Sequence, residues 1–218
     1  PERYDSVEDV FLEFNVLKNP SMVVLKGSGA IYTKSGVVHI GDFSQGLGLW
    51  SDDLEGISFV PDRQVKNIVT IENLTAFHRF DQADTLAVYL AGFHNHPRRQ
   101  LICKAHGTYP SAQLYHWGDI DAGGFRIYFD LCHKTGLPFR PMKMNAEALK
   151  EYREYAKPLT ENDIKAIKAI RMYLAHGILS EIKFESEKAI AEVTTALDWM
   201  LENKLKLEQE IIAYREYM

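Results

Sequence analysis

Short apolar runs alternate with helix-like apolar spacings along the middle of the chain. Four runs predict strands, and three segments with apolar positions every three or four residues predict helices between them: 65–71, 75–80, 86–90, 98–105, 114–117, 122–134 and 138–144. Parallel strands need crossover connections of this kind, and the crossover helices cover both faces of the sheet. The pattern predicts an α/β domain over residues 62–145, with a mostly parallel sheet flanked by helices.

A small N-terminal α+β segment is predicted over residues 1–61. Apolar residues at helical spacing predict a helix over 7–17, which Pro20 ends. Two apolar runs, 22–25 and 37–40, are separated by glycines and predict a pair of strands in one small β element.

Residues 146–218 predict a helical C-terminal extension. Thr160 is followed by Asp163 at the spacing of a capping arrangement, which marks a helix start. Three apolar stripes at helical spacing follow and predict core-facing helices: Ile164, Ile167, Ile170 and Leu174; Ile190, Val193, Leu197, Met200 and Leu201; Leu207, Ile211 and Tyr214.

The composition is that of a globular protein with one sizeable core and a smaller appended one. No stretch approaches the roughly 20 apolar residues of a membrane span, and no leader-like segment opens the chain, so we expect a soluble cytoplasmic protein without a membrane partner. The first residue is proline, so we expect an excised fragment of a longer protein.

The charge distribution favours a nucleic-acid partner more than the net charge of -5 suggests. Residues 1–61 carry 4 Lys and Arg against 9 Asp and Glu, residues 62–145 carry 10 against 7, and residues 146–218 carry 11 against 14. The central segment is therefore basic between acidic flanks, which suits a phosphate backbone. Chance unevenness of solvated charges is the alternative explanation.

Three acidic residues follow the ends of two predicted strands. Glu72 closes the first run, and Asp119 and Asp121 follow the third. The carboxyl ends of parallel strands meet at one edge of a sheet, so these side chains are expected to share a site for Mg²⁺ or Mn²⁺. Gly123 and Gly124 open the next helix and would let backbone N–H groups approach an anion. The alternative is a solvated turn beside an ordinary strand-end acid.

Three basic residues are weaker candidates for contacts to DNA phosphates. Lys104 and His106 precede a glycine at a predicted helix end, and Arg126 follows the acidic turn by one helical turn. A zinc site is not favoured, because the spacing of the nearby histidines and cysteine matches no paired Cys-x-x-Cys motif: His94, His96, Cys103, His106 and His116.

Two motifs carry a family resemblance. Ile71-Glu72-Asn73 and the later run Tyr115-His116-Trp117-Gly118-Asp119-Ile120-Asp121-Ala122-Gly123-Gly124 resemble a Toprim domain of the type found in topoisomerase VI A subunits. The His-Trp-Gly-Asp-Ile-Asp-Ala-Gly part of that run, with the late Leu207-Glu208-Gln209-Glu210, is more similar to the D-subunit family of Wadjet, a bacterial plasmid-defence system. The resemblance covers residues 65–145 well, the helical tail moderately and the first sixty residues only loosely.

The resemblance implies a metal-dependent nuclease that cuts plasmid DNA when an SMC-type ATPase complex recruits it. It implies a Toprim-type sheet, a homodimer, and metal-binding roles for Glu72, Asp119 and Asp121. Members of the family carry an N-terminal DNA-engaging arm that this chain lacks, which agrees with a fragment. Glu72 could act as a metal ligand or as a general base, and the sequence leaves this choice open.

Two other functions remain as alternatives. An aspartyl phosphatase also displays Asp-x-Asp after a strand, although there the pair follows the first strand rather than the third. An inactive Toprim module that dimerises and docks partners is the non-enzymatic alternative. Clustered carboxylates repel one another and are expected mainly where a cation binds, which favours the nuclease.

Overall fold

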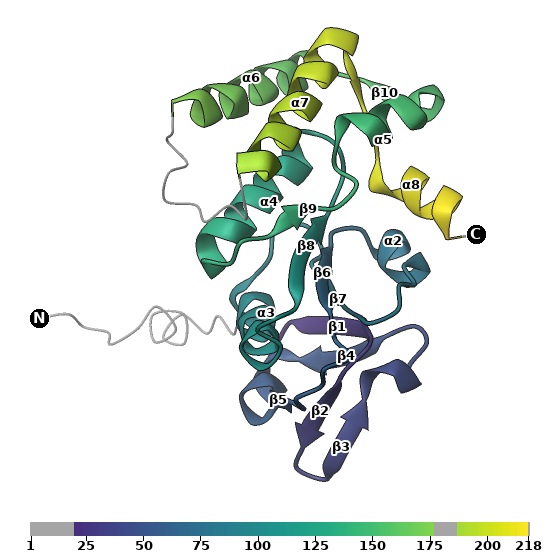
Figure 1. Ribbon diagram of the computed structural model, residues 1–218, viewed down its shortest axis with the longest axis vertical. Helices are drawn as coiled ribbons and strands as arrows, with labels where there is room; N and C mark the ends of the chain where they lie inside the picture. Colours follow the sequence, from purple (N-terminus) through teal and green to yellow (C-terminus); the bar gives the residue numbers. More distant parts are fainter. Residues whose placement is uncertain (1–19, 177–186, 218) are drawn as a thin grey trace, which may run out of the picture.

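The protein is built around one six-stranded sheet. The computed structural model describes residues 20–176 and 187–217. The strands of the sheet are β1 (Met22–Gly27), β4 (Leu47–Trp50), β6 (Asn67–Ile71), β7 (Thr85–Tyr89), β8 (Gln113–Trp117) and β9 (Arg140–Pro141). They lie in the order β4-β1-β7-β6-β8-β9 (Figure 1). β7, β6, β8 and β9 are parallel, whereas β1 is antiparallel to both its neighbours. The prediction of an α/β fold with a mostly parallel sheet is thus confirmed.

Helices cover both faces of this sheet. The helices of the described residues are α2 (Leu74–Arg79), α3 (His96–Thr108), α4 (Ala122–Thr135), α5 (Ala146–Glu151), α6 (Glu161–Ala175), α7 (Glu187–Asn203) and α8 (Gln209–Glu216), with short 3₁₀ turns η1 (Ile40–Asp42), η2 (Ser51–Gly56) and η3 (Arg153–Tyr155). α3 and α4 lie on one side of the sheet, and α2 and α8 on the other (Figure 1). Within the described ranges, no helix is both long and apolar enough to cross a membrane.

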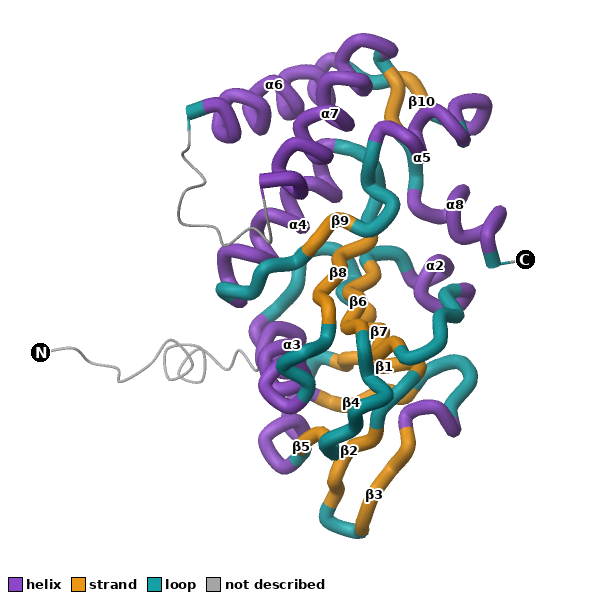
Figure 2. Tube along the Cα trace, viewed as in Figure 1, coloured by secondary structure: helices purple, strands orange, loops and turns teal. Residues whose placement is uncertain are grey.

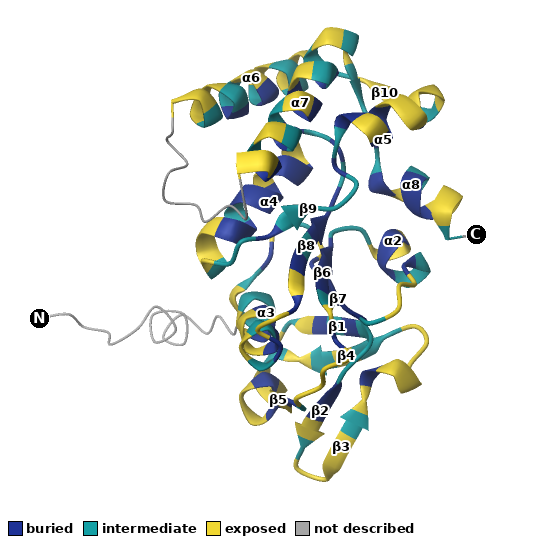
Figure 3. Cartoon of the chain, viewed as in Figure 1, coloured by how far each residue is buried: buried dark blue, intermediate teal, exposed yellow. Residues whose placement is uncertain are grey.

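The central strands are buried on both faces because helices cover both. Residues 68–71 of β6 have no exposed surface, and neighbouring β8 contributes the buried His116 and Trp117 (Figure 3). His116 stacks on Tyr128 of α4, whereas Trp117 packs against Phe80, beyond the end of α2. The two residues therefore face opposite sides of the sheet, as successive strand residues must.

The N-terminal strands do not form the single small element that their sequence suggests. β1 joins the central sheet, whereas β3 (Gly36–His39) pairs with β2 (Ala30–Thr33), which also pairs with β5 (Ser58–Phe59). The prediction of one small β element for these strands is wrong. Gly27, in a left-handed conformation, lets the chain pass close to the carbonyl of Thr85, which then accepts the Ser28 N–H at 2.7 Å. The central sheet therefore crosses the boundary predicted at residues 61–62, and the helix predicted at 7–17 lies outside the described residues.

The C-terminal third is helical, as predicted (Figure 2). Thr160 and Asp163 form a capping box at the start of α6, so this local prediction is confirmed. A short ladder of β10 (Lys157–Pro158) and β11 (Leu205–Lys206) ties α6 to the end of α7. Tyr214 was expected in the core but is 49% exposed, because α8 turns Ile212 and Ala213 inward instead.

Candidate functional site

Pairing between β6 and β8 brings the predicted acidic residues to one edge of the sheet. The strands are parallel and in register, with Ile71 opposite Trp117. The Glu72 N–H donates to the Trp117 carbonyl at 3.0 Å, which extends the ladder past both strand ends. Glu72 therefore lies beside Gly118, and Asp119 follows directly.

The loop that carries the two aspartates is held by the segment before α8. Ile120 and Leu207 exchange backbone hydrogen bonds, in which the N–H groups donate at 2.8 and 3.2 Å. Asp119 Oδ1 accepts the Gln209 N–H at 2.6 Å. These contacts join residues far apart in sequence, so the C-terminal extension fixes the geometry of the acidic loop.

Asp121 has a structural role as the N-cap of α4. Its Oδ1 accepts the Gly124 N–H at 2.8 Å. This N–H is therefore already engaged inside the protein, contrary to the expectation that it would be presented to an anion. Gly124 is needed for a different reason, because a Cβ there would collide with the Asp119 carbonyl.

The electrostatics of the cluster favour protonated or cation-neutralised carboxyls. Burial, together with the charges of Asp119 and Asp121, raises the pKa of Glu72 to about 7. Burial also raises the pKa of Asp119 to about 6, where the Gln209 N–H opposes the effect and the charges of Asp121 and two further glutamates add to it. Removing water from several close carboxylates costs free energy, and a bound cation would offset that cost.

The donor atoms suit a hard divalent cation, although the side chains do not surround an ion as they stand. Glu72 Oε2 is buried and has no hydrogen-bond partner, so this carboxyl still lacks a donor or a cation to offset its burial. Carboxylate oxygens are the preferred ligands of Mg²⁺. Among the described residues, however, no three His, Cys, Asp or Glu side chains are arranged to hold a metal ion. Binding would therefore require the carboxylates to rotate toward one another.

The residues that α8 brings to this site were not among those predicted from the sequence. Gln209 is fully buried and joins both strand ends, because its Nε2 donates to the Trp117 carbonyl at 3.0 Å and its Oε1 accepts the Asn73 N–H at 2.9 Å. Glu208 and Glu210 flank it and add negative charge to the cluster. The run Glu208-Gln209-Glu210 is part of the motif that carries the family resemblance. The residues around it in the sequence give no indication that it folds back over residue 73.

The structure places two of the three predicted DNA-contacting residues, Lys104 and His106, away from the acidic cluster. Lys104 donates to the carbonyls of Leu54 and Ile57, at 2.6 and 3.1 Å, so it anchors η2. His106 lies near the end of α3, which leads into the start of β8 and hence to the opposite edge of the sheet from Glu72 (Figure 1). Arg126 is exposed on the first turns of α4. Their roles in DNA binding stay predictions.

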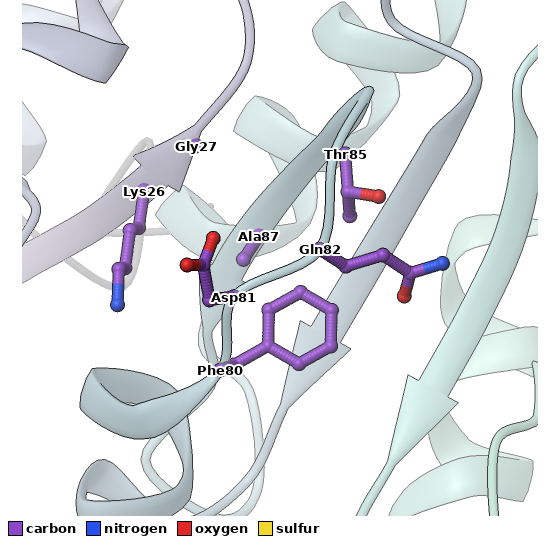
Figure 4. Close-up of a pocket in the computed structure, with 7 residues that line it drawn as sticks. All are labelled: Lys26, Gly27, Phe80, Asp81, Gln82, Thr85 and Ala87. Atoms are coloured by element: carbon purple, nitrogen blue, oxygen red, sulfur yellow. The ribbon is translucent and has the colours of Figure 1, made fainter. Parts of the chain in front are cut away.

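A small cavity lies at that opposite edge, between the end of β1 and the segment leading into β7. It has a volume of about 20 Å³ and is lined by Lys26, Asp81 and Thr85 among others (Figure 4). Lys26 Nζ donates to the His78 carbonyl at 2.6 Å and so ties β1 to the end of α2. A cavity of this size has room for a single water molecule. Its place at the opposite edge of the sheet separates it from the acidic cluster.

Comparison with known proteins points to one family. The family model described as Wadjet protein JetD, C-terminal, matches residues 59–218. The curated Wadjet protein JetD of Bacillus cereus (strain Q1) is 24% identical over 201 residues, which cover 87% of this chain and 48% of that protein. The chain thus spans about half the length of the curated relative that it matches.

Proposed function

The chain belongs to the family of Wadjet JetD C-terminal regions, and from this premise we propose that it is a metal-dependent DNA endonuclease of a bacterial anti-plasmid defence system. The observation that carries the proposal is the acidic cluster at the ends of β6 and β8, where Glu72 and Asp119 have raised pKa values. On the same resemblance we assign the sheet to the Toprim type. The family membership supports a role in Wadjet, and the cluster supports the chemistry.

Phosphodiester hydrolysis requires an attacking water, a place for its proton, and neutralisation of the phosphate charge. Glu72, Asp119 and Asp121 would hold Mg²⁺ or Mn²⁺, and the bound ion would supply Lewis-acid polarisation and acidify water. The Glu72 carboxyl has a pKa of about 7, which suits it to accept a proton at neutral pH. Asp119 and Asp121 are oriented by the N–H groups of Gln209 and Gly124.

Glu72 is either a ligand or the general base, and one variant separates these roles. Glu72→Gln keeps a side-chain oxygen that can coordinate a metal ion, but its amide cannot accept the proton of the attacking water. Loss of plasmid cleavage with retained Mn²⁺ binding would assign Glu72 as the base. Loss of both would assign it as a ligand.

The partners in this proposal are double-stranded plasmid DNA, an SMC-type ATPase complex and a second copy of the chain. The basic balance of residues 62–145 supports a phosphate-backbone partner. The chain as a whole is acidic, so recruitment by the ATPase complex would supply DNA affinity that the chain alone lacks.

An inactive docking module is a second candidate, because both aspartates already have structural partners. Asp119 accepts the Gln209 N–H, and Asp121 caps α4. In a docking module the two residues would hold α8 and α4 in place and do nothing else. This candidate predicts a folded protein without metal-dependent cleavage.

Plasmid cleavage with matched variants tests the proposal. Supercoiled plasmid is incubated with the chain and Mg²⁺, Mn²⁺ or EDTA, alongside Asp119→Ala and Glu72→Ala. Glu55→Ala is the control, since it removes an exposed acid from η2, away from the strand ends. We expect metal-dependent nicking that both site variants abolish and the control keeps. Absence of nicking together with absence of Mn²⁺ binding would favour the docking module.

A further inference from the structure

Four residues at the ends of β6 and β8 share one face of the sheet at its acidic edge. Thr70 lies opposite His116, and two residues further along Glu72 lies beside Gly118. Residues two apart in a strand face the same side, so these four form a square beneath α4. Tyr128 of α4 covers His116, with ring centroids 6.1 Å apart.

Gly118 leaves a gap in this square that two polar atoms face. A Cβ placed on Gly118 would lie 2.6 Å from Glu72 Oε2 and 3.0 Å from His116 Nε2. The separation between Glu72 Oε2 and His116 Nε2 is therefore at most the sum of these two distances. Both atoms are buried and have no hydrogen-bond partner as they stand. Buried polar atoms of native proteins nearly always have one, directly or through a water molecule. The two atoms are therefore natural partners for each other.

The other side of the His116 ring is held by Thr70. The Thr70 hydroxyl lies 3.0 Å from His116 Nδ1 and 3.3 Å from the Tyr115 carbonyl. The hydroxyl has one hydrogen, so it donates either to the Tyr115 carbonyl or to Nδ1, and the contact to Nδ1 is the shorter of the two. If Nδ1 accepts, the neutral ring carries its hydrogen on Nε2, the atom that faces Glu72. The ring has no exposed surface, and burial of this kind disfavours the charged imidazolium.

We propose that His116 is a positioning residue for Glu72, in which Thr70 fixes the imidazole tautomer and Nε2–H donates to the Glu72 carboxylate, directly or through one water, across the gap at Gly118. The role in cleavage rests on the proposed function, whereas the hydrogen bond itself does not. A donor at Nε2 holds one oxygen of Glu72 and leaves the other for a cation or a proton. The arrangement resembles the way outer partners orient carboxylates at metal sites.

NMR of the metal-free and DNA-free chain tests the hydrogen bond without any enzymatic readout. In ¹⁵N-labelled protein the protonated and unprotonated ring nitrogens of His116 have distinct shifts. We expect the Nε2–H tautomer, with an Nε2–H resonance that moves in Glu72→Gln. An Nδ1–H tautomer, or an Nε2–H resonance unaffected by Glu72→Gln, would overturn the proposal.

Two variants of Thr70 test how the tautomer is fixed. Thr70→Ser keeps the hydroxyl and should keep the Nε2–H form. Thr70→Val keeps the shape but removes the donor, so some Nδ1–H form should be populated. Equal spectra for the two variants would contradict the assignment of Thr70 as the donor.

Two variants of His116 separate positioning from packing. The amide of Gln can reach the place of Nε2, whereas the amide of Asn can reach only the place of Nδ1. Both lose the stack on Tyr128, so a purely structural role would impair both equally. We expect His116→Asn to lower Mn²⁺ affinity and plasmid nicking by about 10- to 100-fold and His116→Gln to restore most of both. Equal loss in both variants would overturn the positioning role. If the unchanged chain neither binds Mn²⁺ nor nicks plasmid, the proposed function fails while the NMR result still decides the hydrogen bond.

Discussion

Gly118→Ala probes the candidate site with a single methyl group. The backbone tolerates alanine there, since Gly118 is not among the residues with positive φ. The new Cβ would lie 2.6 Å from Glu72 Oε2, whereas ordinary van der Waals contact begins at 3.4 Å. The Glu72 carboxyl must therefore move by about 1 Å, and a displacement of that size can cost about 100-fold in rate. Overpacking of this kind costs about 1 to 3 kcal/mol of stability.

Gly107→Ala is the matched control, because a Cβ at this position of α3 meets nothing within 4 Å. It should leave cleavage unchanged and stabilise the chain by up to about 1 kcal/mol, the difference in helix propensity. Urea unfolding measures the stability of both variants, and plasmid nicking measures their activity. If Gly118→Ala matches the unchanged chain in both assays, the assignment of Glu72 to the site is refuted.

Three further predictions concern the same edge of the sheet. Glu72 and Asp119, with pKa values of about 7 and about 6, bind protons more tightly in the folded than in the unfolded chain, so metal-free stability should fall as pH rises from about 4 to about 7. The buried histidines change stability with pH in the opposite direction, so the test compares the unfolding free energies of the parent and Glu72→Gln by thermal unfolding across this pH range. The decrease in stability should be about 2 kcal/mol smaller in the variant than in the parent, and an equal decrease in both would contradict the prediction. Gln209→Ala should cost about 2 to 4 kcal/mol in urea unfolding, because it leaves the Asn73 N–H without its acceptor and removes one of the two donors to the Trp117 carbonyl; a cost below about 1 kcal/mol would refute the bridging role. Gly124→Ala should destabilise the chain by about 3 kcal/mol, since its Cβ would meet the Asp119 backbone, and an unchanged unfolding midpoint would argue against this packing.

The sequence predicted those elements whose formation depends on residues that are close together in the chain. The capping box at Thr160 and Asp163 needs only residues three apart, and it forms as expected. The strand ends that place Glu72 and Asp119 on one edge follow from the parallel β-α alternation, because such strands share a direction.

Contacts between distant residues could not be read in the same way. β1 pairs with β7 as well as with β4, although residues 22–27 and 85–89 lie far apart in the sequence, and periodicity says nothing about which strands pair. Gln209 reaches back to Asn73, and its polar character suggests an exposed residue rather than a buried bridge. Lys104 was expected to contact DNA phosphates, yet its ammonium group already donates hydrogen bonds to the carbonyls of Leu54 and Ile57. These features depend on tertiary packing.

Calorimetric titration with Mn²⁺ at pH 6.5, in buffers of different ionisation enthalpy, tests the central claim that the acidic cluster is a metal site. A cation that binds there must displace the protons held by Glu72 and Asp119, because ligating carboxylates are deprotonated. We predict binding coupled to proton release, with both effects reduced in Asp119→Ala and unchanged in Glu55→Ala. Binding without proton release, or binding that Asp119→Ala leaves intact, would place the metal elsewhere and contradict the account.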